Sequence, residues 1–88
     1  MINEPELIEQ LKDPRKREQA FTRLVREYQE PIYWQIRRMV NSHDDADDIL
    51  QNTFLKAWTA IETFRGESKL STWLFRIATN ETLNHLNK

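Results

Sequence analysis

The amino-acid sequence predicts an all-α protein, a compact bundle of about four helices in one domain over residues 1–88. One glycine and three prolines leave few turn formers, and 31% of the residues are charged. Apolar residues recur three and four positions apart over long stretches, which is the helical period. A chain of this length buries only roughly 60 to 65% of its unfolded surface, so it has room for one core and no closed active-site cavity.

A short first helix is predicted in the N-terminal segment 1–12, where the helix itself covers residues 5–12. Asn3 is its candidate cap, because an Asn side chain accepts a hydrogen bond from the exposed N–H groups of a first turn. Pro5 and two glutamates follow, and the first turn of a helix favours both residue types.

The second helix is predicted to be long, over residues 13–41. Asp13-Pro14 repeats the start signal, and apolar residues then follow at helical spacing. Pro31 removes one backbone hydrogen bond inside this segment, so we expect a kink near Tyr28 or a break into two helices. The apolar face consists of Phe21, Leu24, Val25, Tyr28, Ile32 and Ile36.

The third helix is predicted over residues 44–63, with Asp44 as its cap. The segment 41–48 holds four aspartates and no Lys or Arg, and carboxylates at a helix start stabilise it by about 0.3 to 1 kcal/mol each. A calcium loop would need about twelve residues and a glycine at its bend, so we expect no metal site here. The apolar stripe consists of Ile49, Leu50, Thr53, Phe54, Ala57, Trp58 and Ile61.

The stretch FRGESKLSTW separates this helix from the last one. It contains the only glycine of the chain and forms a predicted loop over 64–70. Ser68 or Ser71 is expected to cap a fourth helix over 71–87. The residues of this helix expected to face the core are Leu70, Leu74, Ile77, Ala78 and Leu83. The opposite side presents a polar stripe of Lys69, Thr72, Arg76, Asn80 and Asn84.

Composition excludes several classes of protein. The chain has no cysteine and only short apolar runs, so we expect no thiolate metal site, no cofactor and no membrane insertion, and a cytoplasmic location. The two histidines, His43 and His85, have no nucleophile at a recognisable spacing, which argues against an enzyme.

Two surfaces carry chemistry suited to binding. Arg, Lys and Asn side chains hydrogen-bond bases and phosphates, and an aromatic ring stacks on an unpaired base. The loop and the fourth helix supply both kinds of group, in Phe64, Arg65, Lys69, Trp73, Arg76 and Asn80. The alternative is that the two aromatics belong to the core and the polar stripe is only solvated. On the third helix, Asp48, Gln51, Asn52 and Leu55 form a polar face with one apolar residue, which suits a partner helix or equally a solvated surface.

The motifs together resemble region 2 of bacterial RNA polymerase sigma factors of the extracytoplasmic-function (ECF) group. DDADDILQNTFLKAW is followed by FRGESKLSTWLFRIATNETLNHL, and Phe21, Leu24 and Tyr28 are similar to an earlier helix of that family. The resemblance implies a promoter-specificity subunit that binds RNA polymerase core and promoter DNA in transcription initiation. It covers almost the whole chain and is least informative over 1–12.

The family implies that the loop captures a base flipped out of the promoter −10 element, read as single-stranded non-template DNA during melting. The fourth helix would support that strand. The matching DNA-binding positions are Phe64, Arg65, Ser68, Lys69, Ser71, Thr72, Trp73, Arg76, Asn80 and Asn84. Asn84 stands where the family often has Asp.

The family also implies that the third helix docks on the clamp helices of the polymerase β′ subunit. The matching polymerase-binding positions are Asp48, Gln51, Asn52 and Leu55. Asn52 departs from the usual Glu and removes one charge from this face.

The family normally adds a second domain, region 4, which reads the −35 element. It is absent from these 88 residues, so we expect a fragment that does not initiate transcription alone. Many family members are also held inactive by an anti-sigma factor, and the sequence leaves such a partner open. Two alternatives remain: a helix-turn-helix regulator of duplex DNA, which would have a short turn and a basic last helix, and a helical protein-interaction bundle.

Overall fold

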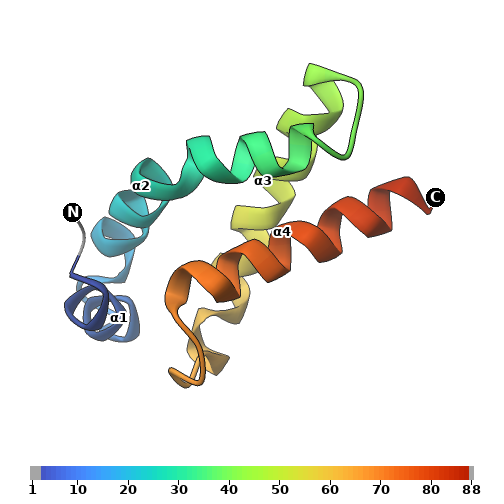
Figure 1. Ribbon diagram of the computed structural model, residues 1–88. Helices are drawn as coiled ribbons and strands as arrows, with labels where there is room; N and C mark the ends of the chain where they lie inside the picture. The colour runs from blue at the N-terminus through green and yellow to red at the C-terminus, as the bar shows by residue number, and fades with distance from the viewer. Residues whose placement is uncertain (1–2, 88) are drawn as a thin grey trace.

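Residues 3–87 are described by a computed structural model, in which they form helices and no strand (Figure 1). The elements are α1 (Glu4–Lys12), α2 (Arg17–Arg37), α3 (His43–Ala60), the short 3-10 helix η1 (Ile61–Thr63) and α4 (Leu70–Leu86). The prediction of an all-α bundle of about four helices is confirmed. Among the described residues, none of the helices combines the length and the apolar character that a bilayer-spanning segment needs.

The first turn of α1 forms as its sequence predicts. The Asn3 side chain accepts a hydrogen bond from the Glu6 N–H at 3.1 Å. Asp13, in contrast, ends α1 instead of starting α2, and its side chain accepts from the Arg15 N–H at 2.9 Å. The residue before a proline is driven toward extended backbone, and Asp13 has that conformation. The helical start predicted at Asp13-Pro14 is therefore a turn, and α2 begins at Arg17.

Helix α2 continues through Pro31 without a break. Its ribbon bends partway along, which agrees with the predicted kink rather than the predicted break (Figure 1). Pro31 lies on the exposed side, while Ile32 and Ile36 are completely buried on the other side. The helix therefore keeps one continuous core face despite the missing backbone hydrogen bond.

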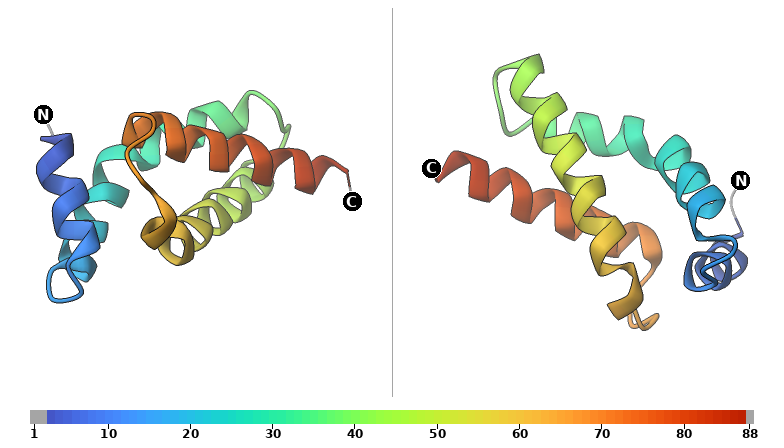
Figure 2. Two further views of the ribbon diagram at one scale, coloured as in Figure 1. Left: turned by 90° about the horizontal axis from the view of Figure 1, so that it is seen from below. Right: turned by 180° about the vertical axis from the view of Figure 1, so that it is seen from behind.

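Helix α3 is the centre of the bundle, because both α2 and α4 pack against it (Figures 1 and 2). Its buried face includes Ile49 and Ala57, and α2 also contacts α4 directly. The buried hydroxyls of Thr53 and Thr82 donate to the carbonyls four residues earlier, at 2.8 and 2.7 Å. Each helix thus buries its threonine without leaving an unpaired polar group.

Two residues expected in the core are exposed. Trp58 is 41% exposed and Leu83 is 44% exposed. Both lie at helical spacing from buried residues, but the neighbouring helices leave a large part of each side chain uncovered. Periodicity identified their side of the helix, and the packing of the bundle decided their burial.

The caps of the last two helices differ from those predicted. Ser42, instead of Asp44, caps α3, and its hydroxyl accepts from the Asp45 N–H at 3.2 Å. Neither Ser68 nor Ser71 caps α4, which begins after Lys69 without a side-chain cap of its own. One of its exposed N–H groups is bound instead by a residue of α1, described below.

We expect Ser42→Ala to lower the free energy of unfolding by about 1 kcal/mol, because it removes the cap of the helix on which the bundle is built. Asn41→Ala, one residue earlier and outside the helix, is the matched control and should change it by less than about 0.5 kcal/mol. Urea denaturation followed by circular dichroism measures both. Equal effects of the two substitutions would contradict the assignment of the cap.

Candidate functional site

The loop between α3 and α4 turns at its single glycine. Gly66 has φ of +75°, a left-handed conformation that residues with a side chain rarely adopt. A Cβ added there would meet no atom within 4 Å, so the backbone conformation, and not lack of space, requires the glycine. Before it, Phe64 follows η1 in extended conformation, and its N–H donates to the Ile61 carbonyl at 3.1 Å.

An aromatic pair closes the base of this loop. The rings of Phe64 and Trp73 lie 5.3 Å apart between centroids and are tilted by 56°. Phe64 is only 4% exposed and belongs to the core, whereas Trp73 is half-buried. Phe64 therefore supports Trp73 from beneath, and Trp73 is the ring that a ligand can reach.

The pair lies beside a cavity of about 350 Å³ with hydrogen-bonding groups around it. The lining residues are Thr63, Phe64, Arg65, Glu67, Ser68, Trp73 and Arg76. A flat aromatic face next to guanidinium, carboxylate and hydroxyl groups is the combination that recognises a single unstacked base.

A groove of about 580 Å³ runs between α4 and α2. From α4 it takes the exposed side chains of Thr72, Arg76 and Asn80, which are four residues apart. Arg76 lines both this groove and the loop cavity, so the two adjoin at this residue. A ligand with a base in the cavity has a path along α4 for its backbone.

Helix α2 supplies the other wall of that groove. Gln35 donates from its amide nitrogen to the Phe75 carbonyl at 3.1 Å and to the Thr79 hydroxyl at 2.8 Å, which fixes α2 against α4. Arg38, near the end of α2, is exposed and lines the groove together with Arg76. Two guanidinium groups therefore flank a groove that is otherwise mostly apolar and amide-lined.

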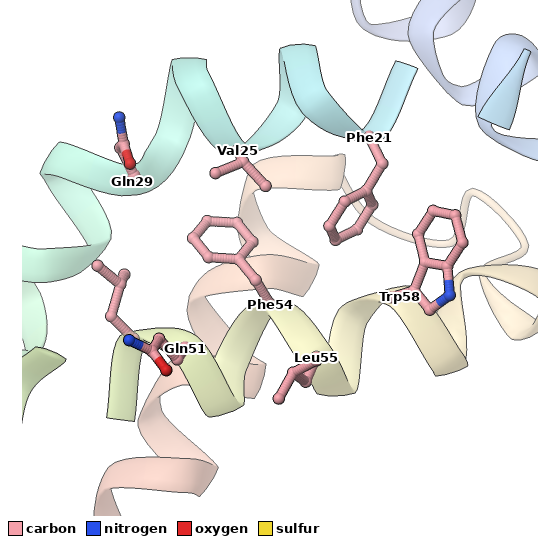
Figure 3. A pocket seen from close by; sticks show the side chains of 8 residues that line it. Phe21, Val25, Gln29, Gln51, Phe54, Leu55 and Trp58 are labelled. Carbon is pink, nitrogen blue, oxygen red and sulfur yellow. The ribbon is translucent and has the colours of Figure 1, made fainter. Parts of the chain in front are cut away.

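A second, apolar groove of about 500 Å³ lies between α2 and α3 (Figure 3). Figure 3 shows Phe21 and Val25 pointing from α2 toward Phe54 and Trp58 of α3. The ring of Phe21 packs edge-on against Trp58, with centroids 5.1 Å apart. The remaining lining residues are Gln29, Leu50, Gln51 and Leu55. The exposed fraction of Leu55 is 64%, which is unusually large for a leucine beside an apolar groove.

Two aspartates at the acidic start of α3 lie close to histidine side chains. His43 Nε2 lies 3.1 Å from Asp47 Oδ2, and His85 Nε2 of α4 lies 3.6 Å from Asp45 Oδ1. Within residues 3–87, no group of three acidic or histidine side chains is arranged to hold a metal ion. The cluster therefore serves the helix start and its contact with α4.

Comparison with known proteins identifies the family of this chain. The family described as Sigma-70 region 2 matches residues 24–88. The chain belongs to the Sigma-70 region 2 family. Membership confirms the family that the sequence motifs predicted, which is a family of sigma factor domains and not of enzymes.

The chain is similar to ECF sigma factors outside the matched segment as well. It is 43% identical over 81 residues to the RNA polymerase sigma-H factor of Pseudomonas aeruginosa, with 92% of this chain and 41% of that protein covered. It is 40% identical over 85 residues to the ECF sigma-E factor of Haemophilus influenzae, with 97% and 43% covered. The chain thus spans about two fifths of the length of these relatives.

A solved structure is similar over nearly the whole fold. An engineered region 2 of sigmaE, studied by NMR in complex with GTAAAA, aligns with a TM-score of 0.84 and 35% sequence identity. The alignment covers 97% of this chain and 86% of that one. The helical arrangement is therefore that of a sigma region 2.

The region 2 fold brings most of the predicted DNA-binding residues together. Phe64, Arg65, Ser68, Trp73 and Arg76 line the loop cavity, and Thr72 and Asn80 line the adjoining groove. Lys69 and Asn84 are exposed outside both linings, and the N–H of Ser71 is engaged by α1. On α3, Gln51 and Leu55 line the apolar groove, while Asp48 and Asn52 are exposed beyond it. What these residues bind stays a prediction at this point.

Sequence reasoning missed several lining residues of these region 2 surfaces, and four of them show why. Trp58 and Phe21 were assigned to the core, although Trp58 follows Gln51 and Leu55 at helical spacing and could have been added to their face. Gln35 and Arg38 belong to α2, and no pattern within α2 indicates that α4 lies beside it. Their contribution follows only from the packing.

We expect Gly66→Ala to lower the free energy of unfolding by roughly 1 kcal/mol, because alanine must adopt the left-handed conformation. Gly66→Asn should cost less, since asparagine tolerates that conformation better. Chemical denaturation of the two variants provides the comparison. An alanine variant as stable as wild type would show that the loop does not need this backbone conformation.

Proposed function

We propose that this region 2 recognises the promoter −10 element as single-stranded non-template DNA, promotes melting, and docks on the β′ clamp helices of RNA polymerase. One observation carries the DNA part: the loop cavity with its aromatic wall is joined through Arg76 to the groove between α4 and α2. The similar region 2 of sigmaE was studied with GTAAAA, which supports this type of ligand.

The size and chemistry of the cavity suit one base. Trp73 offers a ring face for stacking, and Arg65, Glu67 and Ser68 offer donors and acceptors for a base edge. The strand next to the captured base would then lie along Thr72, Arg76 and Asn80, with Arg38 across the groove as a phosphate contact.

The charge of the chain fits a capture mechanism. Net charge is −1, so the domain supplies little of the general attraction that holds duplex DNA. Separating base pairs costs on the order of 1.4 kcal/mol per step in stacking. Binding an unstacked base offsets part of that cost and shifts the population toward open DNA, provided that the polymerase already holds the duplex.

The helix-turn-helix alternative fits the structure poorly. That motif joins its two helices by a turn of three to four residues. Here η1 and the loop separate α3 from α4, and Arg76 is the one arginine on the polar stripe of α4. Insertion of α4 in a major groove would also leave the loop cavity without a role.

The apolar groove between α2 and α3 supports the polymerase contact. Leu55, Phe54 and Trp58 line an open apolar surface, and Gln29 and Gln51 add amide groups to it. An amphipathic helix binds such a groove through apolar residues at helical spacing. The α2–α3 groove, and not the loop cavity, therefore has the chemistry of a helix-binding site. The same chemistry would also suit the alternative function, a helical protein-interaction bundle.

We expect single-stranded GTAAAA to bind more tightly than the same sequence in a duplex. Trp73→Ala should weaken single-strand binding by about 5- to 150-fold, the equivalent of losing one base stack of 1–3 kcal/mol. Fluorescence anisotropy with labelled DNA measures both, after circular dichroism has shown that the variant is folded. Equal affinity for duplex and single strand would refute base capture.

We expect Gln51→Ala and Leu55→Ala to weaken binding to a purified β′ clamp-helix fragment, the leucine variant by about tenfold, because each removes contact area from the groove. Isothermal titration calorimetry measures the affinity. The same two variants should bind single-stranded GTAAAA as wild type does, and Trp73→Ala should bind the clamp fragment normally. Loss of both activities in one folded variant would contradict two separate surfaces.

A further inference from the structure

Helix α1 contacts both ends of the loop that carries the cavity. The family match begins at residue 24, so α1 lies outside it, and α1 was also the least informative segment of the sequence. Its hydrogen bonds nevertheless reach Glu62 and Phe64 before the glycine and Ser71 after it. No other helix holds both ends of the loop in this way among the side-chain hydrogen bonds of residues 3–87.

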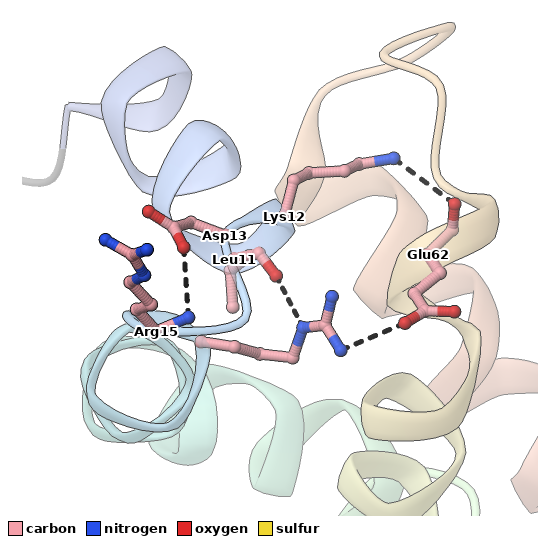
Figure 4. A network of polar contacts seen from close by, with 6 residues as sticks. Leu11, Lys12, Asp13, Arg15 and Glu62 are labelled. Atoms are coloured by element: carbon pink, nitrogen blue, oxygen red, sulfur yellow. Dashed lines mark hydrogen bonds and ion pairs between the residues drawn. The ribbon is translucent and has the colours of Figure 1, made fainter.

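The start of the loop is held by the end of α1. The Lys12 ammonium donates to the Glu62 carbonyl at 3.4 Å (Figure 4). It also donates to the Phe64 carbonyl. Arg17 adds an ion pair to the Glu62 carboxylate, with Nη1 and Oε1 3.0 Å apart, and its Nε donates to the Leu11 carbonyl at 2.8 Å. The backbone that enters the loop is thus fixed at the residue whose ring supports Trp73.

The end of the loop is held by the beginning of α1. Glu4 Oε1 accepts from the N–H of Ser71, in the first turn of α4, at 3.3 Å. Helix α4 has no side-chain cap of its own, so this carboxylate satisfies an exposed N–H and also lies at the positive end of the helix dipole. Glu4 also lies near Tyr28, whose hydroxyl pKa is raised by burial first and then by the charges of Glu4 and Glu27.

Helix α1 is rigid enough to set the separation of these two points. Glu4 and Lys12 are eight residues apart, about 12 Å along a helix axis. Between them, Leu7 and Leu11 are completely buried on the same side of α1. The helix is therefore anchored to the core, and its two polar ends reach the loop from a fixed base.

We propose that α1 positions the base-capture loop, with Lys12 and Glu4 as positioning residues that hold its two ends at the spacing the captured base requires. This inference rests on the proposed function of the loop. A loop ordered before binding loses less conformational entropy when a base enters, so its contacts contribute more to affinity. Substitutions in α1 should then reduce the contribution of the captured base to the binding affinity and leave the contributions of the other bases unchanged.

The test uses the 88-residue chain with single-stranded GTAAAA and six versions of it, each lacking one base. The variants are Lys12→Met and Glu4→Ala. Their matched controls are Lys16→Met and Glu9→Ala, which remove the same charges from exposed positions that make no side-chain hydrogen bond within the described residues. Fluorescence anisotropy gives the affinity for each DNA.

For the wild-type chain we expect one abasic position to weaken binding by tenfold or more. Lys12→Met and Glu4→Ala should weaken binding to intact GTAAAA by three- to tenfold and leave binding to that abasic DNA unchanged. The ratio of the affinity for intact DNA to the affinity for the abasic DNA would therefore fall in these two variants. In Lys16→Met and Glu9→Ala this ratio should equal that of the wild type. A general loss of stability would lower the affinity for both DNAs equally, and that result would overturn the inference, as would a wild-type ratio in both α1 variants.

Failure of the proposed function would look different. In that case the wild-type chain itself would bind intact and abasic DNAs equally. Amide hydrogen exchange without DNA then tests α1 alone, at the hydrogen-bonded N–H groups of Phe64, Ser71 and Trp73. Lys12→Met should speed exchange at Phe64, and Glu4→Ala at Ser71 and Trp73, by threefold or more relative to the controls. Unchanged exchange would overturn the positioning role regardless of what the loop binds.

Discussion

The burial of α3 between α2 and α4 determines where every other surface of this protein lies. Because α2 and α4 both use α3 as their packing partner, the sides of α3 that remain free are few and fixed. One of them, together with α2, becomes the apolar groove with Leu55 and Trp58. The loop that leaves the far end of α3 must return to begin α4, and the cavity forms where it does so. The two candidate interfaces are thus consequences of a single packing arrangement.

The two interfaces use different physical forces. The α2–α3 groove offers apolar area, whose burial depends little on salt. The cavity and the α4 groove offer one accessible aromatic ring, amides and a few guanidinium groups, whose contribution depends on placement. The positions of these groups depend on the surrounding fold. Gln35 holds α2 against α4 by two hydrogen bonds, and the Phe64 ring packs against Trp73. The proposed binding of nucleic acid by a chain with a net charge of −1 therefore depends on a small and well-placed surface.

The sequence was sufficient to predict features that repeat along one helix. The apolar period identified the helices and most of the core, and the polar stripe of α4 contained Thr72, Arg76 and Asn80 in the correct relation. Features that depend on contacts between helices were missed. The N–H of Ser71 in the first turn of α4 is bound by Glu4, sixty-seven residues earlier in the chain, and Trp58 stays 41% exposed although Phe21 of α2 packs against its ring. Local residue preferences carry no information on such pairings, which explains the wrong caps at Ser68 and Ser71 as well as the omission of Arg38. The cap at Asp44 was wrong for a local reason, since Ser42, two residues earlier, provides it.

Arg76 is shared by the loop cavity and the α4 groove. A guanidinium has five N–H donors in one rigid plane, so a hydrogen bond directed toward a base restricts those left for the neighbouring phosphate. If the cavity holds a base and the groove holds the strand, as proposed, the preferred base and the affinity for the strand cannot change independently at Arg76. Under the proposed function, a substitution of Arg76 would then alter both at once, whereas substitutions of Arg65 or Ser68, which line the cavity alone, would alter only the base preference.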